Sequence, residues 1–155
     1  MKRYIDAMRN ERKQQNESMA IGCLIGKANQ ILLGELGKAL KAAGLDITTT
    51  EYLVMRALYS RDGIQQCEIA EMIGRDKAAV SRCVSALEQK HLVRTEAVSY
   101  KCLRVHVTEC GRGLKARIMR VAELRHNALT ELLAPDEFAA FTSALKRIAG
   151  EGTTY

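Results

Sequence analysis

The segment at residues 76–93, DKAAVSRCVSALEQKHLV, has the pattern of a helix that lies closely against another molecule. Val80, Val84 and Leu87 recur at intervals of three and four residues, so they share one helix face and predict that this face is buried. The opposite face has short side chains and two cations, and its members are Lys77, Ala78, Ser81, Arg82, Ser85 and Gln89. A face that only meets water usually carries long charged side chains. Short polar side chains beside cations instead suit a large anionic ligand.

Positive charge is concentrated around this segment. The chain has 155 residues and a formal net charge of +6, and residues 75–104 hold seven Lys and Arg against three acidic residues. Residues 42–74, which come just before, hold two basic residues against five acidic ones. A basic island of this kind favours a polyanionic partner.

Metal binding and catalysis are not indicated. Cys102, His106 and Cys110 form a C-x3-H-x3-C pattern, but Cys110 falls inside the next expected helix. Structural zinc sites normally have four ligands, and no fourth is evident, so we predict neither a metal site nor a cofactor. The sequence has no nucleophile elbow, phosphate-binding loop or HExxH motif, and we predict that the protein is not an enzyme.

Cysteine usage and hydropathy indicate the compartment. Five cysteines with no CxxC pair do not suggest a disulfide framework, and an odd number suits a reducing environment. Lys27 and Glu35 interrupt the apolar stretch at residues 19–40, and the N-terminal residues lack the apolar region of a signal peptide. We therefore predict a cytoplasmic protein with no membrane partner.

Hydrophobic spacing predicts the elements that position these residues. Helices are expected at residues 17–43, 49–61 and 66–73, after an N-cap at Asp76, after Thr108 and from Pro135. Strands are expected at residues 92–96 and 102–107. Residues 1–15 either extend the first helix or precede it. A short helix, a tight turn and a second helix make a helix-turn-helix, to which the two strands add a wing. The expected fold is mainly α with a small β-hairpin wing, together with a helical dimerisation region.

This arrangement explains the short side chains of residues 76–93. In a helix-turn-helix the second helix enters the major groove of DNA, so its axis must approach the DNA closely. We predict that the partner is double-stranded DNA and that the contacts come from Gln66, Lys77, Ala78, Ser81, Arg82, Ser85, Lys101 and Arg104. Lys77 and Arg82 suit phosphates or guanine edges, whereas the hairpin cations suit phosphates. The alternative interpretation is an ordinary solvated helix face.

Three stretches of the chain, ITTTEYLVMRAL, IQQCEIAEMIGRDKAAVSRCVSALEQKHLV and VTECG, resemble the MarR family of bacterial winged-helix regulators. They stand in the order of the family patterns LTxxQ, LAxxLgxdkstvtrlvdrLexkGlV and LTxxG, and the resemblance covers nearly the whole chain. It implies a homodimer, with residues 1–47 and 109–155 as a helical dimerisation region and residues 48–108 as the DNA-binding domain. It also implies binding to pseudo-palindromic DNA, usually as a repressor, with release by a ligand or an oxidant.

The chain departs from the family pattern in and near the wing. Ser99 and Lys101 stand where the family often has an Asp-x-Arg pair, and the wing is shorter than usual. His91 stands where the family usually has a glycine after the recognition helix, at a position that favours positive φ. The departures therefore concern the wing and its entry more than the recognition helix.

A small-molecule effector is expected between the helical and winged parts, in a pocket lined by the first, second and fifth helices. Tyr52, Met55 and Tyr59 are candidates to line this pocket. Tyr and Met at helical spacing also suit an ordinary core, so both interpretations stay open.

Two further hypotheses keep the fold and change the function. In the first, Cys23 is a redox switch, because the hydroperoxide-sensing branch of the family has its reactive cysteine in this part of the first helix. The tyrosines of that branch have no evident counterpart here, and the alternative is that Cys23, Gly22 and Gly26 permit close helix packing. In the second, the chain is a dimeric interaction module that no longer binds DNA.

Overall fold

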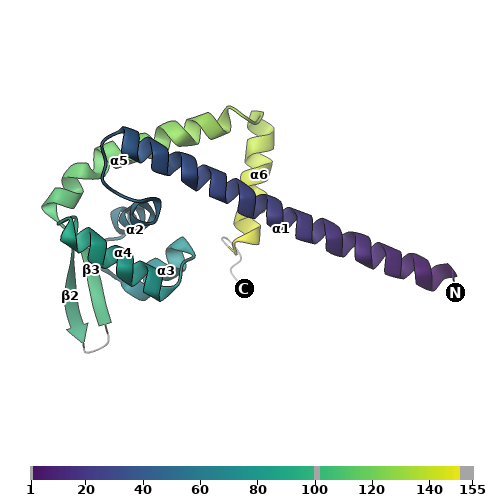
Figure 1. Ribbon diagram of the computed structural model, residues 1–155, viewed down its shortest axis with the longest axis horizontal. Helices are drawn as coiled ribbons and strands as arrows, with labels where there is room; N and C mark the ends of the chain where they lie inside the picture. Colours follow the sequence, from purple (N-terminus) through teal and green to yellow (C-terminus); the bar gives the residue numbers. More distant parts are fainter. Residues whose placement is uncertain (1, 100–101, 151–155) are drawn as a thin grey trace.

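The computed structural model describes the backbone of residues 2–99 and 102–150, with side chains in residues 20–98 and 103–150. The elements, in chain order, are α1 (Lys2–Ala42), α2 (Thr49–Ser60), β1 (Ile64–Gln65), α3 (Gln66–Ile73), α4 (Lys77–Gln89), β2 (Val93–Ser99), β3 (Cys102–Val107), α5 (Glu109–Thr130) and α6 (Pro135–Ile148). Figure 1 shows α1, α5 and α6 extending away from a lobe that contains α2, α3, α4 and the sheet. The predicted mainly helical fold with a small β wing is confirmed.

Helix α1 is much longer than the sequence pattern indicated. It is a single helix of 41 residues, so the N-terminal residues extend the predicted helix rather than precede it. Of its apolar stripe, Leu36 and Leu40 are buried, whereas Ile21, Leu24 and Ile31 are 56%, 65% and 55% exposed. Only the C-terminal end of the stripe therefore packs against the same chain.

The two helices of the helix-turn-helix begin where the sequence predicted. Helix α3 spans Gln66–Ile73 and ends at Gly74, which has a left-handed φ of 61°. Helix α4 begins after Asp76, whose carboxylate accepts a hydrogen bond of 2.8 Å from the Ala79 amide, as expected of an N-cap. Val80, Val84 and Leu87 are fully buried in the core, which confirms the predicted inner face of α4.

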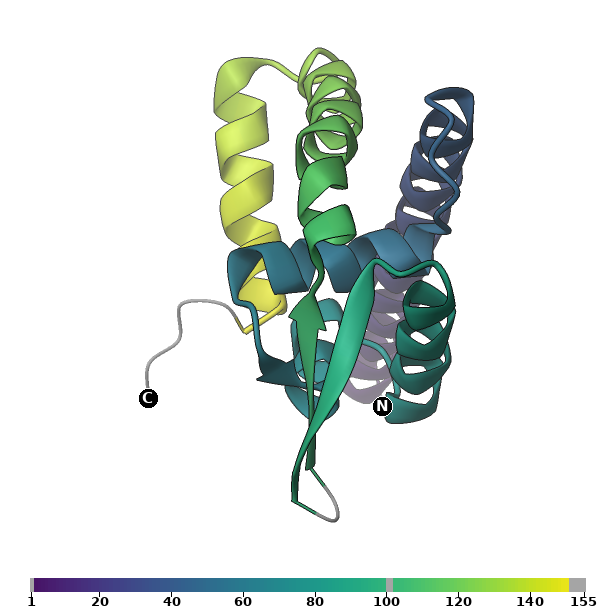
Figure 2. The same cartoon turned by 90° about the vertical axis from the view of Figure 1, so that its left-hand side faces the viewer.

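The sheet has three strands in the order β1-β3-β2, all antiparallel. Strand β1 was not predicted, because two residues are too few for a hydrophobic period and pair only with a distant strand. It aligns Ile64 with Val105 across the sheet. Strand β2 also runs to Ser99, beyond the predicted end, so the wing projects far from the lobe (Figure 2).

The two C-terminal helices begin where the sequence indicated. The Thr108 hydroxyl accepts a hydrogen bond from the Gly111 amide and caps α5, and Pro135 is the first residue of α6. In α5, Ile118 is fully buried against the core, but α6 contains no buried residue. Leu132 lies just beyond the end of α5 and is 76% exposed.

The backbone at His91 supports a test of local strain. His91 has a φ of 57°, in the region that glycine tolerates best, and its side chain is exposed. Relief of this strain exceeds the added entropy of an unfolded glycine, so His91→Gly should raise the free energy of unfolding by up to about 1 kcal/mol. Urea denaturation measures this change.

A reciprocal variant provides the control. Gly74 has a similar φ of 61°, and a Cβ added there would meet no atom within 4 Å. Gly74→Ala should therefore lower the free energy of unfolding by about 1 kcal/mol through backbone strain alone. A destabilised His91→Gly variant would show that the imidazole contributes more than its backbone strain removes.

Candidate nucleic-acid interface

The outer face of α4 is free along its length. Lys77, Ala78, Ser81, Arg82 and Ser85 are all exposed, which places the predicted contact residues of this helix on one surface. Among the described residues, no ion pair involves Lys77 or Arg82. The face thus combines two unpaired cations with side chains short enough for a close approach.

Charge at the N-terminal end of α4 is organised by its cap. The hydrogen bond from the Ala79 amide, assisted by the Arg82 guanidinium, holds the pKa of the Asp76 carboxyl below its ordinary value.

Gln66, a predicted contact residue outside α4, is half-buried in the first turn of α3. It therefore lies at the start of the first helix of the helix-turn-helix.

The described part of the wing exposes both basic and apolar side chains. Arg104 is exposed and pairs in the sheet register with Glu96, and Arg94 lies 3.6 Å from the same carboxylate. Val98 and Leu103 are exposed apolar residues farther out along the hairpin. The predicted contact Lys101 and the side chain of Ser99 lie outside the described residues.

The C-terminal end of α4 is fixed by contacts that the sequence did not reveal. The Glu88 carboxylate accepts hydrogen bonds of 2.8 and 2.7 Å from the amide and the hydroxyl of Thr95 in β2. The Lys90 ammonium donates to the Asp46 carbonyl at 2.8 Å and to both carboxylate oxygens of Glu51. These partners are separated by up to 44 residues in sequence, so no local pattern signals them.

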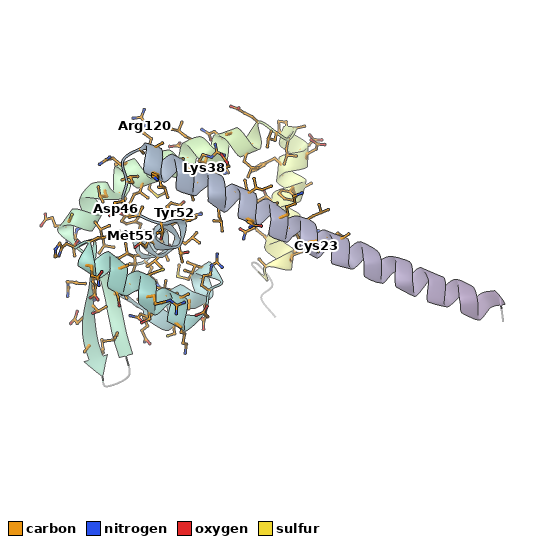
Figure 3. The ribbon with its side chains drawn as sticks, in the orientation of Figure 1. Cys23, Lys38, Asp46, Tyr52, Met55 and Arg120 are labelled. Carbon is orange, nitrogen blue, oxygen red and sulfur yellow. The ribbon has the colours of Figure 1, made fainter. Side chains whose placement is uncertain are left out.

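The three effector candidates lie in the core of the lobe or pack against it. Met55 is fully buried and Tyr52 is 4% exposed, both within the core cluster, and Figure 3 shows them side by side in the lobe. The Tyr59 hydroxyl donates a hydrogen bond of 2.7 Å to the Gly111 carbonyl, and burial raises the pKa of Tyr59 to about 12. These contacts are those of core and packing residues.

A cavity of about 560 Å³ lies instead at the corner between α1 and α2. Residues 44–49 line it together with Gly37 and Lys41. The corner joins the long helical arm to the winged lobe. The cavity is lined by the end of α1, the connecting residues and the start of α2, and by none of the three effector candidates.

The cysteines differ in their surroundings. Cys23 is exposed on α1, far from the winged lobe (Figure 3), and Cys110 is exposed at the start of α5. Burial raises the pKa of the Cys83 thiol, which fits a small core residue.

Within the described residues, no group of three His, Cys, Asp or Glu side chains is arranged to hold a metal ion. No described helix is both long and apolar enough to cross a membrane.

The MarR family model matches residues 47–97 of the chain. Among solved structures, the chain is similar to a MarR transcriptional regulator from Methanosarcina mazei Go1, with 22% identity over 85% of this chain and 88% of that chain and a TM-score of 0.74. It is similar to MepR of S. aureus in a complex with DNA, with 20% identity, 82% and 93% coverage and a TM-score of 0.73.

A third similar structure contains a small molecule. CouR from Rhodococcus jostii RHA1, bound to p-coumaroyl-CoA, has 24% identity over 87% of this chain and 94% of that chain, with a TM-score of 0.73. No curated protein sequence matches the chain. The structural likenesses show that the winged-helix fold of MarR regulators extends over most of the molecule.

The cap of α4 predicts a pH dependence. Because the folded state lowers the pKa of Asp76, its contribution to stability is present above the unfolded pKa of about 3.9 and is lost as the pH falls through the folded pKa. Asp76→Asn keeps a good N-cap without a titrating group. Urea denaturation between pH 7 and pH 3 should show the wild type losing stability relative to the variant on acidification. Identical pH profiles would contradict this role of the carboxylate.

Proposed function

We propose that this chain is a winged-helix regulator of the MarR family, a homodimer that binds a pseudo-palindromic operator and is released by a small molecule. Repression is the mode that the resemblance to MarR regulators implies. The observation that carries the proposal is the free outer face of α4, with its short side chains and unpaired cations. Such a face suits the major groove of DNA.

The proposed DNA contacts are of two kinds, to the bases and to the phosphate backbone. Helix α4 enters the major groove, with Arg82 and Lys77 reaching guanine edges or phosphates and with Ser81 and Ser85 near the bases. Contacts that position the protein on the backbone come from Gln66, Lys101 and Arg104. MepR, to which this chain is similar in fold, was solved in complex with DNA, which supports DNA as the partner.

The helical arms support the dimer in this proposal. Large apolar side chains are exposed on α1, after α5 and on α6, and they include Ile21, Leu24, Ile31, Leu132, Phe141 and Ile148. Apolar patches of this extent normally mark an association surface. We assign dimerisation to residues 1–47 and 109–155 and DNA binding to residues 48–108.

An effector is proposed to bind between these parts. The cavity of about 560 Å³ at the corner of α1 and α2 has the size of a small-molecule site. The acyl-CoA bound to CouR supports a ligand-responsive switch on this fold. The sequence suggested Tyr52, Met55 and Tyr59 for this role. Residues 44–49 are better candidates, because they line the cavity. No observation on Cys23 in the described structure favours the thiol switch.

Removal of the central cation tests the DNA interface. Arg82→Ala should weaken specific DNA binding by about 1–3 kcal/mol and relax the preference at one base pair if Arg82 pairs with guanine. Arg120→Ala is the matched control, because Arg120 is also exposed but lies on α5, away from α4 (Figure 3). Fluorescence anisotropy on selected and scrambled duplexes measures both quantities.

The alternative outcomes separate the roles of Arg82. A loss that is equal on every sequence, with a shallower salt dependence, assigns Arg82 to a phosphate. Equal affinities for the Arg82→Ala and Arg120→Ala variants and the wild type would contradict the proposed interface.

A charge on the exposed stripe of α1 tests the dimer. Leu24→Glu should convert the protein to monomers in sedimentation velocity, because a carboxylate would be buried unpaired in the interface. Val98→Glu on the wing is the control, since Val98 is exposed to a similar degree (56%) but lies outside the arms. A dimer that survives Leu24→Glu would move the interface away from this stripe.

A further inference from the structure

We propose that the ion pair of Glu51 and Lys90 is a positioning device that fixes the recognition helix α4 to the corner between α1 and α2. This inference rests on the proposed function and deepens it. In the dimer, the pair would set how α4 is placed relative to the helical arms, and therefore the spacing between the two DNA half-sites that the protein accepts.

Lys90 is held by three acceptors at once. Its ammonium donates to the Asp46 carbonyl at 2.8 Å and lies 3.1 and 3.0 Å from the two carboxylate oxygens of Glu51. Three acceptors match the three protons of an ammonium group, so its bonding capacity is filled. Because Lys90 directly follows the last residue of α4, this contact fixes the end of the helix.

Glu51 is buried to an unusual degree for a carboxylate. It is 3% exposed, and it is the buried charged residue of the described core. Its Oε2 atom also accepts a hydrogen bond of 2.6 Å from the Thr48 amide, while the Thr48 hydroxyl accepts from the Glu51 amide at 3.2 Å. One carboxylate therefore caps α2 and receives Lys90 from α4.

A glutamine would cap α2 nearly as well, so capping alone does not explain the buried charge. Buried ion pairs contribute little net stability, because the loss of hydration offsets the attraction, but their geometry is specific. A pair that joins two elements is therefore better explained by the orientation it imposes than by the stability it adds.

The corner that receives Lys90 is itself attached to the helical arms. Leu45 and Ile47 are buried in the core, and the Arg117 side chain of α5 donates a hydrogen bond of 2.9 Å to the Ala43 carbonyl. The corner is thus in contact with α1 and α5 on one side and with α4 on the other. The Lys90 ammonium also lies 3.9 Å from the Asp46 carboxylate. Apart from Lys90, no described residue of α4 or its C-cap makes a side-chain hydrogen bond or ion pair with this corner.

The test uses a variant in which the pair is replaced without leaving a lone buried charge. The double variant Glu51→Gln with Lys90→Met retains the capping amide oxygen and removes both charges. Lys38→Met is the matched control, because it also removes a Lys–Glu ion pair, of 2.8 Å with Glu35, but on the exposed surface of α1. All proteins are full-length and bind duplexes selected from random DNA by the wild type.

The first readout is half-site spacing. Insertion of one or two base pairs between half-sites should weaken wild-type and Lys38→Met binding by about tenfold or more, because each insertion displaces and rotates one half-site. The double variant should lose less than about threefold on the same insertions, while its affinity for a single half-site stays within about twofold of the wild type. A double variant with the wild-type spacing preference would overturn the proposal.

The second readout is amide hydrogen exchange in the free protein, which does not require DNA. The double variant should exchange about tenfold faster at residues 44–48 and 88–92 together, with α3 unchanged. If the wild type selects no DNA, the proposed function fails, and this readout decides the link by itself. Unchanged exchange, or faster exchange in only one of the two segments, would then overturn it.

Discussion

The structure depends on how α4 is attached to the rest of the molecule. Val80, Val84 and Leu87 are fully buried and hold one face of the helix in the core. The cap at its N-terminus and the bonds of Glu88 and Lys90 at its C-terminus hold its ends. None of these contacts uses the outer face. Because attachment and recognition use opposite sides of one helix, the face that suits DNA stays open and rigid.

Large parts of the helical arms have the opposite property, because their apolar side chains are exposed among the described residues. Helix α6 buries no residue, and most of the apolar stripe of α1 has no cover within the chain. Helices of this kind gain most of their stability from packing. A second copy would supply that packing, and the orientation of α4 relative to the arms would then determine how two recognition helices address one DNA molecule.

Sequence reasoning succeeded where the signal is local. Helical periodicity, the N-caps Asp76 and Thr108, and Pro135 at a first helical position placed the starts of three helices correctly. The positive φ of His91 followed from the glycine that the family usually has there. These features depend on residues within one or two helical turns, so the local sequence predicts them.

Features that depend on contacts between distant residues were not predicted from the sequence. Strand β1 exists only because Ile64 and Gln65 pair with β3, some 40 residues away. The Glu51–Lys90 pair joins residues 39 apart, and each alone suggests only an exposed charge. Periodicity identified the apolar stripe of α1 but not its exposure, because a pattern shows which side chains need cover and not what covers them.

DNA recognition is tested most directly by binding of the reduced protein to a labelled fragment of its own upstream DNA, with unrelated DNA as competitor at two salt concentrations. We expect specific binding that weakens steeply with salt, with a log–log slope of about −0.9 for each phosphate neutralised. Weak binding without preference or salt dependence, on this fragment and on DNA selected from random pools, would contradict DNA recognition and favour the dimeric interaction module.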